Sequence, residues 1–154
     1  MVVILGVANL LADGLSMAAG RYLGAKAELE RRQNARQRER RHIALVPAGE
    51  REEVRQILFL KGFEGDELEA AVEVITGDRD VWIEFMLVEE LGFSPEPDRP
   101  WSAAFATFTG FLMWGLIPVA PFIVDTAADG ISQPGLWSLG LTAAAFTAIG
   151  YIKG

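Results

Sequence analysis

Apolar residues gather in three stretches of the chain, each nearly free of charge. The first covers residues 1–23, the second residues 101–124 and the third residues 134–153. A helix rises about 1.5 Å per residue, so crossing about 30 Å of hydrocarbon takes roughly 20 apolar residues. Pro118 and Pro121 predict a kink or break late in the second stretch, because each removes a backbone hydrogen bond. The pattern predicts an all-α membrane protein with three transmembrane helices.

Between the first two stretches lies a polar segment, residues 24–100, which we expect to form a helical insert outside the membrane. Residues 21–100 carry 31 of the 35 charged side chains. Residues 24–45 are rich in Ala, Glu, Gln and Arg and predict a stalk helix that continues the first span. We expect Pro47 and Gly49 to break that helix. Apolar residues then recur at helical spacing in three further segments, residues 50–63, 66–76 and 78–91.

Glycines and one capping residue mark the ends of these shorter helices. Gly62 and Gly65 separate the first segment from the second, and Gly77 is expected to stop the second. Asp78 stands where a side-chain oxygen would cap the third. The insert is therefore predicted to be a small helical bundle.

The distribution of basic residues predicts how the chain is oriented. Six arginines lie in residues 31–41, directly after the first span, and Arg99 precedes the second, whereas residues 125–133 contain no Lys or Arg. Because basic residues favour the cytoplasmic side, the insert is predicted to be cytoplasmic, with the N-terminus outside and Lys153 inside. The formal net charge is −7, and the basic cluster is better explained by topology than by nucleic acid. We expect a multi-pass integral membrane protein surrounded by lipid.

Three pairs of donor side chains in the insert are candidates for holding a metal ion. Each pair is three or four residues apart, which puts both side chains on one helix face. The pairs are Glu39 with His42, Glu50 with Glu53, and Met86 with Glu90. Carboxylates with one imidazole and one thioether suit a divalent transition ion better than calcium. Other interpretations stay open, since such glutamates are common on solvated helices, His42 would also suit a helix C-terminus, and Met86 would also suit a core.

Polar residues in the first span form a second candidate site. Asn9, Asp13 and Met17 fall on one helical stripe. A carboxylate inside a membrane span costs roughly 2.5–3.5 kcal/mol on insertion scales, which makes Asp13 a candidate for function. A carboxylate and a thioether one turn apart would form a way-station for a divalent metal, and Asp13 would exchange protons. The alternative is a structural hydrogen bond to a neighbouring helix.

Three motifs give the chain a family resemblance. They are GVANLLADGLSMAAGRYLGAKAE (6–28), VWIEFMLVEELG (81–92) and GFLMWGLIPVAPF (110–122). In sequence and in order these motifs resemble the vacuolar iron transporter family. The resemblance implies a five-span protein that dimerises and has a cytoplasmic metal-binding domain. It also implies export of ferrous iron from the cytosol in exchange for protons, across the inner membrane of a bacterium or a vacuolar-type membrane.

Matching positions carry the family's functional residues onto this chain. The implied metal ligands are Glu39, Glu50, Glu53, Met86 and Glu90. His42 stands where the family often has another glutamate, and Leu87 where a second methionine can occur. Met17 is the membrane methionine, and Asn9 occupies a position where some members have an acidic residue. The resemblance also implies that the family's first span would precede Met1 and its fifth would follow Gly154, so the chain corresponds to the middle three spans.

The sequence therefore predicts a transporter that exports a divalent metal from the cytosol by proton exchange, as a homodimer. Ferrous iron is the first candidate ion, with Mn²⁺ and Zn²⁺ as further candidates, and the metal is cargo rather than a permanent cofactor. The alternative is a membrane-tethered metal-binding or buffering protein that does not transport, or a fragment of a five-span transporter. The sequence resembles neither a catalytic triad nor a phosphate-binding loop, so we expect no enzymatic activity.

Overall fold

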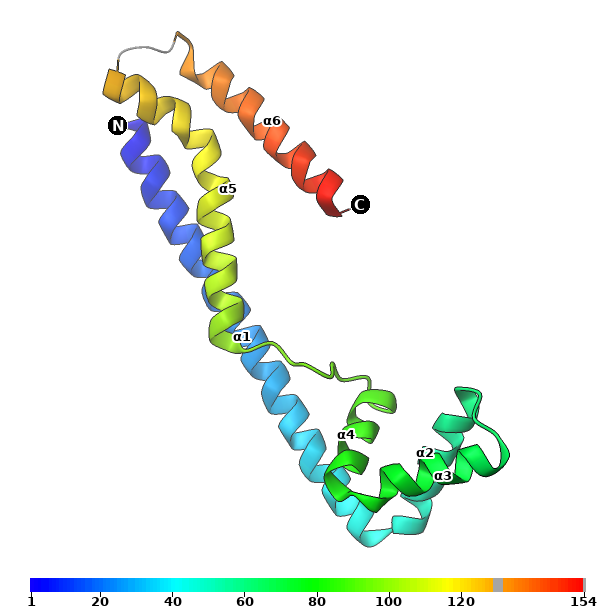
Figure 1. Cartoon of the computed structure of the whole chain (residues 1–154). Helices are drawn as coiled ribbons and strands as arrows, with labels where there is room; N and C mark the ends of the chain where they lie inside the picture. The colour runs from blue at the N-terminus through cyan, green and yellow to red at the C-terminus, as the bar shows by residue number, and fades with distance from the viewer. Residues whose placement is uncertain (129–131, 154) are drawn as a thin grey trace. The chain divides into compact units, whose positions relative to one another are not determined.

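A computed structural model describes residues 1–128 and 132–153 (Figure 1). All regular secondary structure in these residues is α-helical. In these residues the chain forms the helices α1 (Val2–Leu45), α2 (Pro47–Leu60), α3 (Gly65–Gly77), α4 (Arg79–Glu89), α5 (Pro100–Ala128) and α6 (Pro134–Lys153). The prediction of an all-α protein is confirmed. Residues 129–131 of the loop used for the predicted orientation, and the side chain of Lys153, lie outside the described part.

The chain divides into two compact units. The first consists of Met1–Gly24 and Arg99–Gly154, and the second of Ala25–Asp98. The first unit thus holds the beginning of α1 with α5 and α6. The second unit holds the rest of α1 with α2, α3 and α4. Each candidate site lies within one of these units.

In the first unit, small residues let α1 and α5 approach closely. A Cβ atom added to Gly115 would lie 2.1 Å from Cδ1 of Leu10, and one added to Gly14 would lie 3.1 Å from Cδ1 of Phe111. Larger side chains at these positions would push Leu10 or Phe111 aside, so the two glycines favour the close approach that is common where membrane helices pack. Near the other end of the pair, the rings of Tyr22 and Trp101 lie 4.8 Å apart between centroids. These contacts run antiparallel along the two helices.

In the described part of the chain, α1 and α5 are long and apolar enough to cross a membrane. Such helices also occur in the cores of soluble proteins. Here, however, only 17% of the most apolar stretch of α1 and 6% of that of α5 is buried. The predicted third span coincides with α6, which has 20 residues. That α6 crosses the membrane stays a prediction.

The two prolines of the second predicted span do not break its helix. Pro118 and Pro121 lie inside α5, which continues to Ala128 and bends toward its C-terminal end (Figure 1). The hydroxyl of Ser138, on α6, donates a hydrogen bond of 2.7 Å to the carbonyl of Pro118. Hydroxyl groups on neighbouring helices often bond backbone groups near a membrane proline. Ser138 therefore links α6 to the bent part of α5.

The second unit has its own hydrophobic core. Its fully buried members come from α2, α3 and α4, and they are Val54, Val72, Ile83, Met86 and Leu87. Within α4, Ile83, Met86 and Leu87 are three and four residues apart, which places them on one face of that helix. Gly62 and Gly65 have φ angles of +97° and +57°, which a residue without a Cβ adopts at little cost. They form the turn that lets α2 and α3 pack against each other.

The helix boundaries agree with the predictions to within four residues: α2 covers Pro47–Leu60 against the predicted 50–63, and α5 ends at Ala128 against the predicted 124. The stalk helix ends at Leu45, as expected, and Asp78 caps α4 by accepting hydrogen bonds from the N–H groups of Asp80 and Val81. Gly49 does not break a helix, because it lies inside α2, which begins at Pro47. Proline removes a hydrogen bond from a helix interior but fits a first turn without that cost, so Pro47 is well placed to begin α2 directly after α1 ends.

A row of ion pairs holds α4 along the stalk part of α1. Arg36 donates to Asp80 at 2.9 Å and to Glu84 at 3.1 Å. Arg32 also pairs with Glu84, and Arg40 approaches Asp80 at 3.5 Å. Single exposed pairs contribute little to stability, about 0–1 kcal/mol, but a connected row fixes geometry better than isolated pairs do. These five side chains fix the position of α4, which carries Met86 near its C-terminal end.

Candidate metal centre

Three of the predicted ligands meet where α1 ends and α2 begins. Glu39, His42 and Glu50 each offer one ligand atom, and these atoms all lie within 4.8 Å of one another. Nδ1 of His42 lies 3.6 Å from Oε1 of Glu50. Ligands bound to one first-row ion at about 2.0–2.2 Å are at most about 4.4 Å apart, so the observed spacing is close to that of a shared ion.

The sequence explains locally why these three side chains come together. Glu39 and His42 are one turn apart in the last turns of α1, and a single residue, Val46, separates α1 from α2. The N–H group of Glu50 donates to the carbonyl of Val46 at 3.2 Å, which places Glu50 in the first turn of α2. A carboxylate is favoured at a helix N-terminus and an imidazolium at a C-terminus. The sharp turn at Pro47 therefore brings the two helix ends, and their donors, face to face.

The carboxylate of Glu50 is the most unusual group of this trio. The residue is 8% exposed, and its Oε2 atom is buried without a hydrogen-bond partner. A buried polar atom without a partner costs about 1–3 kcal/mol, and more when it is charged. Glu39 is likewise buried, at 3% exposure. Two buried carboxylate groups beside a half-exposed imidazole form a site that a cation would stabilise.

Two further carboxylates add negative charge around the trio. Burial raises the pKa of Glu50 above its ordinary value, and the charges of Glu53 and Glu39 raise it further. Partial burial also raises the pKa of Glu90, and the negative charges of Glu39 and Glu53 raise it further. Unit charges interact strongly only at short range. Glu53 and Glu90 therefore lie near the trio, although both residues are exposed. We call Glu39, His42, Glu50, Glu53 and Glu90 the acidic cluster.

Glu50→Gln is expected to stabilise the metal-free chain at pH 7, because it removes a buried negative charge. Each kcal/mol gained in the free energy of unfolding should raise the melting temperature by roughly 2–4 °C. The folded state holds the Glu50 proton more tightly than the unfolded chain, because burial raises the pKa. Above that raised pKa, ionised Glu50 lowers the free energy of unfolding. This loss of stability disappears as the pH falls through the raised pKa toward 4.5, the ordinary value for the unfolded chain. Thermal unfolding of the full chain in detergent, between pH 7 and 4.5, measures the difference.

Glu73→Gln is the matched control, since Glu73 is an exposed carboxylate on α3. It should leave the melting temperature unchanged at every pH in this range. Saturating metal should reverse the order at pH 7, because the natural chain then gains stability by binding and Glu50→Gln gains less. A metal-free Glu50→Gln chain that melts below the natural chain at pH 7 would contradict the burial argument.

Met86 is placed differently from the other predicted ligands. Its side chain is fully buried and belongs to the hydrophobic core of the second unit. Glu90, one turn later, bonds through its backbone N–H to the carbonyl of Met86 at 3.1 Å. This burial favours the interpretation of Met86 as a core residue, and its role as a ligand stays a prediction.

The predicted pathway residues lie in the first unit, on α1. Asn9 and Asp13 are exposed, and Met17 is half exposed. Met17 lines a mostly apolar cavity of about 430 Å³ together with residues of α5 and α6, among them Thr107 and Thr142. Asn9 and Asp13 do not line this cavity. Neither threonine could be picked out from the sequence, because a hydroxyl that bonds its own helix looks the same in sequence as one that faces a cavity.

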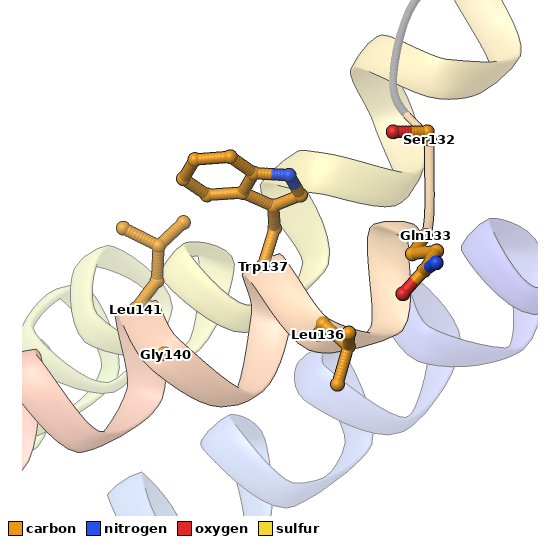
Figure 2. A pocket seen from close by; sticks show the side chains of 6 residues that line it. All are labelled: Ser132, Gln133, Leu136, Trp137, Gly140 and Leu141. Carbon is orange, nitrogen blue, oxygen red and sulfur yellow. The ribbon is translucent and has the colours of Figure 1, made fainter.

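Figure 2 shows a second hollow of the first unit, at the start of α6. It has a volume of about 570 Å³ and is lined by Ser132, Gln133, Leu136, Trp137, Gly140 and Leu141. Trp137 and Leu141 project from one side of the helix and Leu136 from the other. None of the predicted site residues lines it, and its lining carries no charged side chain. It therefore lacks the carboxylate and imidazole donors of the predicted metal site.

Comparison with known proteins agrees with the resemblance seen in the sequence. Vacuolar iron transporter 1 of Oryza sativa subsp. japonica is 33% identical over 156 residues, which cover 100% of this chain and 60% of the rice protein. Vacuolar iron transporter 1 of Arabidopsis thaliana is 32% identical over 151 residues, covering 97% and 59%. A vacuolar iron transporter of Toxoplasma gondii is 33% identical over 133 residues, covering 84% and 44%.

The chain thus spans about three fifths of the length of the plant relatives. The VIT family model matches residues 1–154. A match of this extent covers both units and every residue of the acidic cluster, which confirms the predicted family. The chain belongs to the VIT family.

Proposed function

We propose that this chain takes part in moving a divalent metal ion, ferrous iron first among the candidates, from the cytosol across a membrane. Glu39, His42 and Glu50 would capture the ion, with Glu53 and Glu90 holding it near by charge. The relatives are named vacuolar iron transporters, which supports iron as the cargo. Their names also agree with the expectation that the chain is not an enzyme.

One observation supports metal capture above the others. The buried Oε2 atom of Glu50 lacks a hydrogen-bond partner although Glu39 and His42 stand beside it. A hydrogen-bonded structural role would have satisfied that atom, since buried polar groups nearly always have partners. A divalent cation would satisfy it and would neutralise the repulsion among the carboxylates.

The membrane step would use the polar stripe of α1. Asp13 and Asn9 are exposed on a helix that is apolar enough to cross a membrane. An exposed carboxylate is costly against lipid, so such a residue generally faces another protein surface or water. We propose that a second copy of the chain supplies that surface, that Asn9, Asp13 and Met17 line the pathway, and that Asp13 exchanges protons. The insert would then face the cytosol, in a vacuolar-type or bacterial inner membrane.

The test is anaerobic uptake of Fe²⁺ by vesicles that contain the full chain. Vesicles with an acidic interior and a trapped Fe²⁺ indicator should accumulate metal, and a protonophore should slow that accumulation. Mn²⁺ and Zn²⁺ added outside should compete if they share the site. Vesicles without protein give the leak rate.

A metal buffer without transport is the second candidate function. It is favoured by the position of the acidic cluster, which lies entirely in the unit Ala25–Asp98 and needs no membrane residue to assemble. A buffer would bind Fe²⁺ saturably, yet its vesicles would fill only at the leak rate. Uptake above that rate would exclude it.

A further inference from the structure

We infer that His42 sets the metal preference of the acidic cluster, favouring the late first-row ions Co²⁺, Ni²⁺ and Zn²⁺, with Fe²⁺ behind them, over Mn²⁺. The inference rests on the proposed capture function and names the class of ion that the site takes. It concerns the one imidazole of the chain, since the sequence contains a single histidine.

The first step is the position of the imidazole. Nδ1 of His42 lies 3.6 Å from Oε1 of Glu50. One ligand atom of Glu39 lies within 4.8 Å of a ligand atom of each of these two residues. A separation of 3.6 Å is too long for a hydrogen bond. The ring nitrogen therefore lies close to the carboxylate without being hydrogen-bonded to it, which leaves both atoms available to one ion.

The second step is the contrast in burial within the trio. The side chains of Glu39 and Glu50 are 4% and 10% exposed, whereas that of His42 is 51% exposed. The two carboxylates thus form the inner part of the site, and the imidazole covers its solvent side. The exposed ring can turn to adjust its nitrogen to the ion, while the buried carboxylates stay in place.

The third step is the chemistry of the donors. Apart from His42, the acidic cluster offers carboxylate oxygens only, and oxygen ligands suit Mg²⁺, Ca²⁺ and Mn²⁺. Imidazole nitrogen suits Zn²⁺, Ni²⁺ and Fe²⁺ better, and divalent affinity at such sites rises from Mn²⁺ through Fe²⁺ and Co²⁺ to Ni²⁺. One nitrogen among oxygens therefore shifts the preference away from Mn²⁺. Without His42 the cluster would be a site of oxygen ligands.

The experiment measures competition between Zn²⁺ and Mn²⁺ for the full chain in detergent, prepared without a polyhistidine tag. The natural chain should prefer Zn²⁺, and His42→Glu should lower the ratio of Zn²⁺ to Mn²⁺ affinity by about tenfold. That value is the low end of the 10–100-fold changes in affinity caused by single groups around a metal. Gln37→Glu adds the same charge to the exposed surface of the stalk helix, about 140° around it from His42, and should leave the ratio unchanged.

A spectroscopic measurement separates ligation from a general effect of charge. Mn²⁺ bound at saturation should show nitrogen modulation of its electron spin echo in the natural chain, and none in His42→Glu. Because the chain has one histidine, an imidazole signal identifies its source.

The outcomes distinguish this inference from the proposed function. An unchanged affinity ratio, or no nitrogen signal with metal bound, would overturn the role of His42 while leaving metal capture intact. If the natural chain binds neither ion saturably, both the inference and the capture function are wrong. A reduced ratio with loss of the nitrogen signal supports both.

Discussion

Replacing Glu50 and Glu53 together by glutamine should lower the affinity of the full chain for Fe²⁺ by more than about 100-fold. Losing a group that merely supports a metal ligand already costs about 10–100-fold. The double change removes the buried carboxylate whose Oε2 atom lacks a partner, and the neighbouring charge that acts on it. Helix content should stay the same, because glutamine keeps the shape of both side chains and their helix propensity. Anaerobic titration with Fe²⁺ and circular dichroism measure the two quantities.

The control is Glu67→Gln with Glu73→Gln. Both residues are exposed on α3, so this pair changes the net charge by the same amount without touching the acidic cluster. It should bind Fe²⁺ as the natural chain does. Equal losses in the two double variants would show that only overall charge attracts the metal. Unchanged affinity in Glu50→Gln with Glu53→Gln would remove both residues from the site.

The helices could be predicted from the sequence because their signals are local. Hydrophobic spacing, Pro47 and the capping oxygen of Asp78 act within a few residues of the chain. The error at Gly49 comes from treating glycine as a helix breaker. A glycine inside a helix costs only about 1 kcal/mol, and in the first turns of α2 the core contacts of Val54 and Leu58 offset that cost.

The site could be predicted in part. The spacing of Glu39 and His42 puts them on one helix face, but nothing in that spacing says which other donor joins them. That depends on the angle of the turn at Pro47, which brings in Glu50 and not the fully buried Met86. Angles between helices are set by packing over the whole unit, so short-range patterns do not determine them.

The ion pairs between α1 and α4 were missed, although their signal is present in the sequence. Arg32, Arg36 and Arg40 are spaced four residues apart, and so are Asp80 and Glu84. Such spacing makes a stripe of one charge on each helix. The prediction of membrane orientation uses only the number of arginines and not their spacing. The structure shows that three of them also pair with α4.

Asp13→Asn should reduce metal uptake by vesicles to the leak rate while leaving Fe²⁺ binding by the acidic cluster unchanged. A carboxylate in a membrane-spanning helix costs roughly 2.5–3.5 kcal/mol on insertion scales, and asparagine keeps its size without the charge. The change removes both an attraction for a cation and a group that takes up a proton. Because Asp13 belongs to the first unit and the acidic cluster to the second, binding and uptake should respond separately. Uptake into vesicles and titration in detergent give the two values.

Asp125→Asn is the control in the same unit, because Asp125 is a partly buried carboxylate near the end of α5. It removes the same charge outside the polar stripe and should leave uptake unchanged. Uptake at the natural rate in Asp13→Asn would exclude Asp13 from the pathway and favour a structural hydrogen bond. Loss of both uptake and binding would mean instead that the change disturbs the fold of the chain. Loss of uptake alone would place the membrane step on the stripe of α1, separate from the step that captures the metal.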